Sequence, residues 1–325
     1  MNEQKLNQKI GQQDIEQVPT RNGYGEGLMA LGETDPNVVV LTADLRDSVK
    51  AGDFAKKYPD RFVECGVAEQ NMMGMAAGLA LAGKTAFVSS YAVFSPGRSW
   101  DQLRVSVCYS EANVKVVGAH TGVSVGPDGA THQALEDIAI TRVLPNLTVV
   151  VPIDSIEAKK ATIALGQMKG PAYLRLTREK TPVVTREDSV FEVGKADILR
   201  DGSDVAIIGC GPILYNALLA AKELEKEGVQ VMVINNHTIK PIDAETIIAA
   251  AKKCQAVVTL EEHQVIGGAG SAVCEVLARN YPVPVEMVGM QDRFGESGEP
   301  DELIQKFGMG VQAVRQAVMR VKSRK

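Results

Sequence analysis

The chain has 325 residues and a formal net charge of −5, from 35 Lys and Arg against 40 Asp and Glu. Hydrophobic residues make up 45% of it and charged residues 23%, as in ordinary globular proteins, which excludes disordered, collagen-like and disulfide-framework classes. Without a basic excess, neither nucleic acid nor an anionic membrane is expected as a partner.

Residues 1–17 are polar and rich in glutamine, so no secretory signal is expected there. The most apolar window, residues 72–83, is too short to cross a bilayer. Five scattered cysteines form no CxxC pair, which predicts free thiols and no zinc or redox motif. Together these features predict a cytoplasmic protein.

In the first half of the chain, short β-branched runs alternate with longer helical patterns. Strands are predicted at residues 38–41, 87–88, 114–118 and 148–151, and helices at 69–82, 96–110 and 155–166. Because the strands are continuous apolar runs, they indicate a parallel sheet that helices cover on both faces.

Between residues 181 and 203, prolines, glycines and charges predict a linker with short strands. The alternation then restarts, with strands predicted at 204–209, 229–234, 256–260 and 283–288 and helices at 213–226, 244–253, 270–279 and 311–321. We therefore expect an α/β protein of two domains, residues 1–185 and a smaller one at 186–325.

The first candidate functional residue is Glu69, which follows the predicted strand 62–65 and opens a helix of Met, Ala and Gly. A carboxylate in a first helical turn is ordinarily a surface residue that complements the helix dipole. The dense apolar residues that follow Glu69 favour partial burial instead, where a carboxyl group can share a proton with a ligand.

The second candidate is the segment 120–133, which lies between a predicted strand and a helix and contains His120, Asp128 and His132. We call it the histidine loop. Loops at the carboxyl ends of parallel strands are where such sheets bind ligands. A metal is not expected, because His120 and His132 lie 12 residues apart with no Cys or HExxH partner. Arg21, Ser48 and Arg178 are further candidates for anion binding, although each alone reads as a surface residue.

At Glu69 and the histidine loop the sequence resembles the transketolase family of thiamine diphosphate enzymes, and in particular the C-terminal half of a transketolase as a separate chain. The resemblance spans residues 20–320. It is carried by Ala-Asp-Leu at 43–45, Gly-Val-Ala-Glu at 66–69, Gly-Pro-Asp-Gly-Ala-Thr-His-Gln at 126–133 and Phe-Gly-Glu-Ser at 294–297. The family's Gly-Asp-Gly motif for the diphosphate and its metal is not found here.

The resemblance implies a pyrimidine-binding domain at 1–185 and a transketolase C-terminal domain at 186–325. It implies that Glu69 hydrogen-bonds a pyrimidine ring nitrogen of thiamine diphosphate and promotes the imino form that takes the thiazolium proton. Phe94 matches the ring that packs on the pyrimidine, and Asp44 matches a cofactor contact.

For the substrate, the resemblance implies that His120 and His132 move protons and that Asp128 binds a hydroxyl group. The sugar phosphate would meet Arg21, Ser48, His120 and Arg178. The implied reaction moves a two-carbon unit from a ketose phosphate to an aldose phosphate, in the pentose phosphate pathway. A partner chain would hold the diphosphate and Mg²⁺, and a homodimer contact would give an α2β2 complex.

Three other functions stay open on the sequence. A beta-type subunit of a 2-oxo acid dehydrogenase has the same two domains, but the Thr-His-Gln string is not expected in it. A deoxyxylulose phosphate synthase normally carries three domains and lacks a His at the position of His120. A non-catalytic assembly or regulatory protein could keep the fold, although the joint retention of Glu69, Phe94, Asp128 and His132 argues against that.

Overall fold

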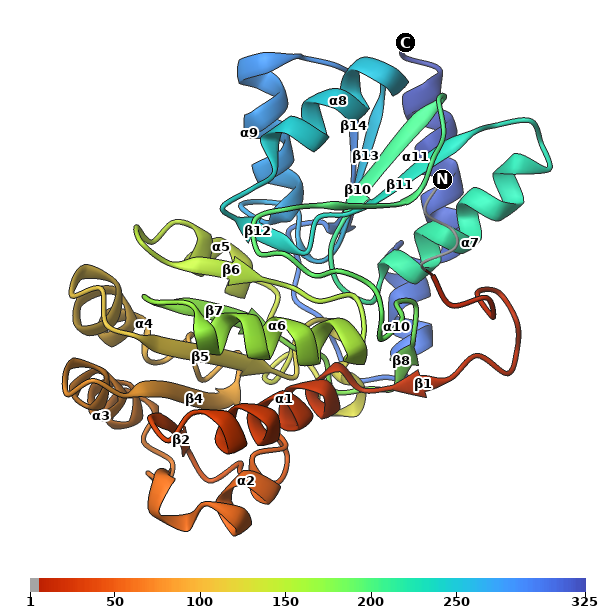
Figure 1. The fold of residues 1–325 in the computed structure, drawn as a ribbon. Helices are drawn as coiled ribbons and strands as arrows, with labels where there is room; N and C mark the ends of the chain where they lie inside the picture. Colours follow the sequence, from red (N-terminus) through yellow and green to blue (C-terminus); the bar gives the residue numbers. More distant parts are fainter. Residues whose placement is uncertain (1–5) are drawn as a thin grey trace.

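The computed structural model describes residues 6–325, so the first five residues of the glutamine-rich segment lie outside the described part. Two sheets flanked by helices lie one above the other in Figure 1. A third, two-stranded sheet joins β1 (Gln17–Val18) to β8 (Thr181–Pro182).

The larger sheet has seven strands in the order β12-β6-β7-β5-β4-β2-β3. Six of them pair in parallel: β2 (Val38–Thr42), β3 (Phe62–Glu64), β4 (Thr85–Tyr91), β5 (Val114–Ala119), β6 (Thr148–Val150) and β7 (Ala172–Arg175). The seventh, β12 (Thr238–Lys240), comes from the second half of the chain and pairs antiparallel with β6.

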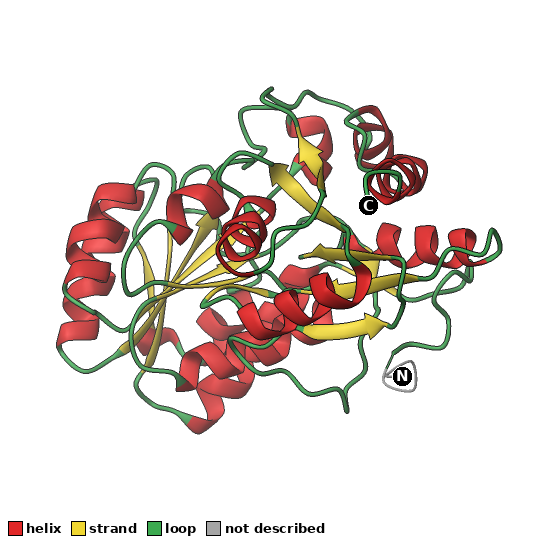
Figure 2. Ribbon diagram, turned by 90° about the horizontal axis from the view of Figure 1, so that it is seen from above, coloured by secondary structure: helices red, strands yellow, loops and turns green. Residues whose placement is uncertain are grey.

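Helices cover both faces of this sheet, as the apolar strands predict (Figure 2). Strand β2 shows why: Val38 and Val40 pack with α1 (Thr20–Thr34) and α6 (Ser155–Gln167), whereas Val39 and Leu41 face α3 (Glu69–Leu81) and η3 (Leu103–Tyr109). The shorter helical segments of this half are α2 (Gly52–Lys57), η2 (Pro59–Arg61), α4 (Trp100–Gln102), η4 (Val123–Asp128) and α5 (Asp137–Arg142).

The smaller sheet has the order β14-β13-β10-β11-β9. Strands β10 (Val205–Gly209), β11 (Val231–Asn235), β13 (Val257–Gln264) and β14 (Val285–Met290) are parallel, and β9 (Asp197–Arg200) is antiparallel. Helices α7 (Leu214–Glu225) and α11 (Val311–Lys322) cover one face, and α8 (Ala244–Cys254) and α9 (Ala269–Asn280) cover the other. Helix α10 (Pro300–Lys306) lies against η4.

The predicted α/β class with two helix-covered parallel sheets is confirmed. Several elements were not predicted, among them helix α1, the central strand β7 and the edge strand β12. Helix α1 contains Gly23, Gly25, Gly27 and Gly32, which weaken a helical pattern. At Gly23 and Gly27 a Cβ atom would overlap the backbone of α6 or Thr162, so these glycines permit a close helix–helix contact. The predicted helix 96–110 begins later, at Trp100, and continues as the π-helix η3.

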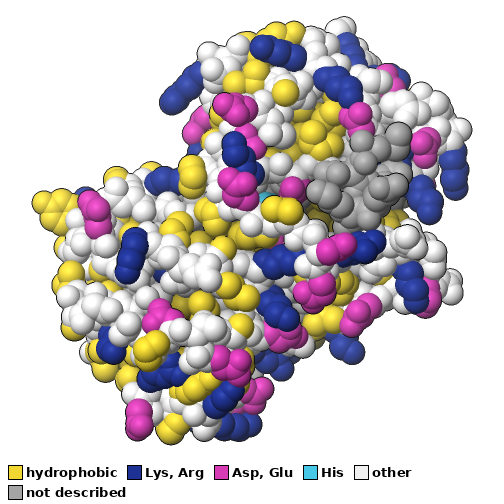
Figure 3. All heavy atoms as spheres, in the orientation of Figure 1, with side chains coloured by type: hydrophobic (Ala, Val, Ile, Leu, Met, Phe, Trp, Pro, Cys, Tyr) yellow, Lys and Arg dark blue, Asp and Glu magenta, His cyan; other side chains and the backbone are white. Residues whose placement is uncertain are grey.

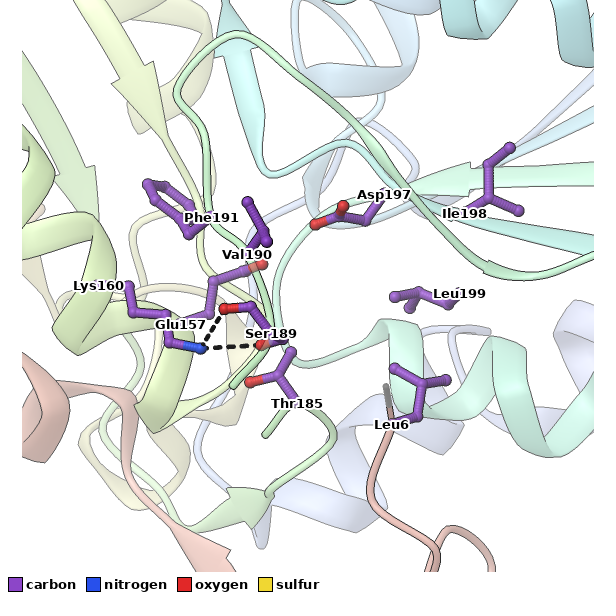
Figure 4. A pocket seen from close by; sticks show the side chains of 10 residues that line it. All are labelled: Leu6, Glu157, Lys160, Thr185, Ser189, Val190, Phe191, Asp197, Ile198 and Leu199. Atoms are coloured by element: carbon purple, nitrogen blue, oxygen red, sulfur yellow. Dashed lines mark hydrogen bonds between the residues drawn. The ribbon is translucent and has the colours of Figure 1, made fainter. Parts of the chain in front are cut away.

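The predicted linker lies along α6. Lys160 Nζ donates to the carbonyl oxygens of Arg186 and Ser189 and to the Ser189 hydroxyl, at 2.6–2.9 Å. Figure 4 shows the contacts of Lys160 with Ser189, at a pocket between α6 and β9. Asp154 caps α6 and also accepts the Val184 N–H at 2.8 Å. These contacts fix the path of the chain between the two sheets.

Charges of both signs are interspersed over the face drawn in Figure 3. Within residues 6–325, no helix combines the length and the apolar composition that a membrane crossing requires. All five cysteines are free: Cys108, Cys210 and Cys254 are buried, and Cys65 and Cys274 are partly exposed. The free thiols agree with the sequence analysis.

Candidate active site

The sequence-predicted site residues gather where parallel strands of the larger sheet end. Asp44 follows β2, Glu69 follows β3, Phe94 follows β4, His120 follows β5 and Arg178 follows β7. Because these strands are parallel neighbours, their carboxyl ends share one edge of the sheet, which is where open α/β sheets bind ligands.

Four rings form a cluster at this edge. Tyr91, at the end of β4, stacks on His120 with ring centroids 3.8 Å apart and on Phe94 at 6.0 Å. Phe94 contacts the edge of His132 at 5.5 Å. The structure therefore brings Phe94, His120 and His132 together. Tyr91 was not singled out from the sequence, although it ends a strand three residues before Phe94.

Two arginines stand beside this cluster. Arg21 Nη1 lies 3.3 Å from His120 Nε2 and donates to the Ser48 carbonyl oxygen at 2.8 Å. Arg178 lies 3.5 Å from the Asp128 carboxylate, which is exposed. Arg21, Arg178 and His120 therefore share one electropositive region. Ser48 contacts this region through its backbone carbonyl oxygen, which accepts from Arg21, and not through its hydroxyl group.

His120 is held in an unusual setting. Its backbone has φ 56°, in the left-handed region, and only 2% of the residue is exposed. Burial, with Arg21, Arg178 and His132 adding to the effect, lowers the pKa of His120 to about 3. The imidazole is therefore neutral at pH 7, and its Nδ1 has no hydrogen-bond partner among the described residues. The resemblance assigns proton transfer to His120, whereas a ring that is neutral at pH 7 is suited to hydrogen bonding.

Glu69 is the first residue of α3 and is buried, with 3% exposed. The sequence predicted partial burial, and the burial is nearly complete. Its Oε2 has no hydrogen-bond partner within residues 6–325. A buried carboxyl oxygen without a partner fits a ligand that offers a ring nitrogen, because a hydrogen bond to that nitrogen would satisfy it. Neither Glu69 nor Asp44 hydrogen-bonds the rings or arginines described above.

Asp44 lies in the turn after β2 with its side chain exposed. Its backbone has φ 61°, and its N–H donates to Glu64 Oε1 at 2.7 Å. Glu64 also accepts from the Thr42 hydroxyl at 2.7 Å. Glu64 was not predicted from the sequence. Its carboxylate fixes the turn and leaves the Asp44 side chain free to meet a ligand.

Glu157, Asp197 and His237 place one ligand-type atom each within 4.8 Å of one another, near the pocket of Figure 4. Within this group His237 Nε2 lies 3.7 Å from Asp197 Oδ2. The Glu157 carboxylate already accepts hydrogen bonds from the Ile153 N–H and from Asn235 Nδ2. These contacts account for Glu157 without a metal ion.

Two transketolase domain families match this chain. The model of the transketolase pyrimidine-binding domain matches residues 16–184, and that of the transketolase C-terminal domain matches residues 194–314. The chain belongs to the transketolase family. The resemblance stated from the sequence is thereby confirmed, and the family implies dependence on thiamine diphosphate.

Several relatives of this transketolase-family chain have nearly its length. A transketolase C-terminal section from Methanocaldococcus jannaschii is 44% identical over 92% of this chain and 95% of its own. A 6-deoxy-6-sulfo-D-fructose transketolase subunit from a Clostridium species is 40% identical over 96% and 97%. A solved split-gene transketolase, described as an inactive beta4 tetramer, is 45% identical with a TM-score of 0.89 and covers 95% of this chain and 99% of that one. The chain thus belongs to the C-terminal subunits of split transketolases.

Proposed function

We propose that this chain is the C-terminal subunit of a two-chain transketolase that transfers a two-carbon ketol unit from a ketose phosphate to an aldose phosphate. The observation that carries the proposal is the buried Glu69, with a partnerless Oε2, at the same sheet edge as the cluster of His120, Arg21 and Arg178.

Glu69 would hydrogen-bond a pyrimidine ring nitrogen of thiamine diphosphate, and Phe94 would pack on that ring. When bound, the cofactor supplies the carbon nucleophile that attacks the ketose carbonyl. Glu69 contributes by sharing a proton with the ring, a role that a positioned carboxyl group performs in general acid–base catalysis. Asp44 would contact the cofactor from the turn after β2.

His132 would move protons between the substrate and solvent, since it is only partly buried. His120 would act as a neutral hydrogen-bond partner of the substrate, through the Nδ1 that no other group in the described part of the chain satisfies. Asp128 would accept a hydrogen bond from a substrate hydroxyl and so favour one stereoisomer.

Arg21 and Arg178 would bind the phosphate of the sugar, with His120 and Ser48 beside them. Guanidinium groups bind phosphate oxygens through two parallel hydrogen bonds, which suits this role. The Arg178 side chain is about one-third exposed, so an incoming anion can reach it.

A companion chain would bind the diphosphate and Mg²⁺, because the motif for them is not found here. We propose an α2β2 complex of cytoplasmic location in the pentose phosphate pathway. Residues 1–185 would form the pyrimidine-binding domain and residues 186–325 the C-terminal domain. The matched ranges 16–184 and 194–314 support this division.

The test is reconstitution. The purified chain is mixed with its companion, thiamine diphosphate and MgCl₂, and then given xylulose 5-phosphate and ribose 5-phosphate. Formation of sedoheptulose 7-phosphate is expected, and neither chain alone should form it. Turnover of pyruvate or another 2-oxo acid in place of the sugars would contradict the proposal, and full activity without the companion would contradict the shared site.

A further inference from the structure

The histidine loop is held in place by residues from the C-terminal domain. The Ser124 N–H donates to Glu262 Oε1 at 2.7 Å. Gln133 Nε2 donates to the Glu296 carbonyl oxygen at 2.9 Å. Just beyond the loop, the Gln264 N–H donates to the Leu135 carbonyl oxygen at 2.8 Å. The segment that carries His120, Asp128 and His132 is therefore attached to β13 and to the chain after β14.

Glycines allow this close approach. A Cβ atom at Gly122 would overlap the Glu262 carboxylate, and one at Gly295 would overlap Gln133 Oε1. Gly122 also has φ 81°, which favours glycine. Two sequence motifs that lie more than a hundred residues apart, at 126–133 and 294–297, thus meet in the structure.

Glu262 is the most unusual of these contacts, because it is a buried carboxyl group, 6% exposed, that accepts a backbone N–H from the other domain. Burial raises its pKa. On the following residue of the loop, the Val125 carbonyl oxygen accepts from Arg178 Nη1 at 2.8 Å. The Ser124 N–H is thus bound by Glu262 of the C-terminal domain, and the neighbouring Val125 carbonyl oxygen is bound by Arg178 of the first domain.

We propose that Glu262 is a positioning residue for the active site: its carboxyl oxygen fixes the histidine loop and, through Val125, the Arg178 guanidinium. This assigns to the C-terminal domain the task of holding the substrate-binding loop. That Glu262 affects catalysis rests on the proposed function, whereas that it holds the histidine loop does not.

The first experiment uses the full chain alone and measures hydrogen–deuterium exchange of backbone amides in residues 122–129. Glu262→Ala should speed exchange there about tenfold, because a buried hydrogen bond is lost. Glu262→Gln keeps an acceptor oxygen and should exchange as the wild type does. Val314→Ala, on the buried face of α11, should lower the melting temperature without speeding exchange in the loop.

The second experiment uses the complex with the companion chain, thiamine diphosphate and MgCl₂. Glu262→Ala should raise KM for phosphorylated donors about tenfold, and Glu262→Gln should restore it to within about threefold of the wild type. The positioning role would be overturned if Glu262→Ala left amide exchange in the loop unchanged. It would also be overturned if Glu262→Gln raised KM as much as Glu262→Ala does, or if Val314→Ala sped exchange in the loop as much as Glu262→Ala does. If loop exchange changes as expected but the wild-type complex turns over no sugar, the proposed function fails and the structural role stands.

Discussion

At the scale of single residues, the site depends on side chains whose surroundings differ from what their sequence neighbours suggest. The motif at 126–133 and the strand-end position of Glu69 pointed to two segments of the candidate site, and the family resemblance supplied Arg21, Asp44, Ser48, Phe94 and Arg178. Tyr91 and Glu262 could not be predicted, because each acts through contacts with distant parts of the chain. The neutral state of His120 also depends on packing, since burial and two arginines cause it.

The pKa of His120 gives a direct prediction. In the free chain it should remain neutral down to a pH of about 3, and Arg178→Ala should raise its pKa because a nearby positive charge is removed. Inorganic phosphate bound at the arginines should raise it as well. With four histidines in the chain, NMR titration of the imidazole nitrogens measures this. A His120 pKa near 6.5 in the free wild type would show that the ring is not buried as described.

Arg178→Ala should weaken binding of phosphorylated donors, raising KM by about 10-fold or more, since a charge-assisted hydrogen bond contributes about 1.5–3 kcal/mol. Donors without phosphate should be affected much less. Arg186→Ala is the matched control, because Arg186 pairs with Asp188 on the exposed linker. Steady-state kinetics of the reconstituted complex measure both KM values. An equal rise in KM for donors with and without phosphate would refute the assignment of Arg178 to phosphate binding.

At the scale of helices and strands, the sequence predicted those strands that are continuous apolar runs. Strands such as β2, with all five residues buried, have no polar face and read directly as buried. Helix α1 was missed because its glycines serve packing against α6. Strand β12 was missed because it joins a sheet formed by distant residues, and the sequence around Thr238 holds no sign of that pairing.

Two glycine substitutions test this account of α1. Gly23→Ala should destabilise the chain by about 1–3 kcal/mol, because the added methyl group would overlap the Ser155 carbonyl oxygen. Gly78→Ala in α3 is the control, since no heavy atom lies within 4 Å of its added Cβ, and it should be neutral or stabilising by up to about 1 kcal/mol. Urea unfolding of the free chain measures both. Equal stability of the two variants would argue against tight packing of α1 on α6.

At the scale of the whole molecule, the two sheets have different tasks. The larger sheet presents the candidate catalytic and binding residues at one edge, and the second half of the chain holds their loop and adds the edge strand β12. Glu69 nevertheless has an oxygen with no hydrogen-bond partner among residues 6–325. That oxygen is the reason to expect a pocket that this chain completes only with a cofactor and a companion.

The most direct test is the rate of deuterium exchange at the thiazolium C2 of thiamine diphosphate in the reconstituted complex. Our account predicts rapid exchange with the wild-type chain and exchange about 10²–10⁴ times slower with Glu69→Gln, the range typical of a lost proton-transfer group. Equally rapid exchange in the wild type and in Glu69→Gln, with the cofactor bound in both, would contradict it.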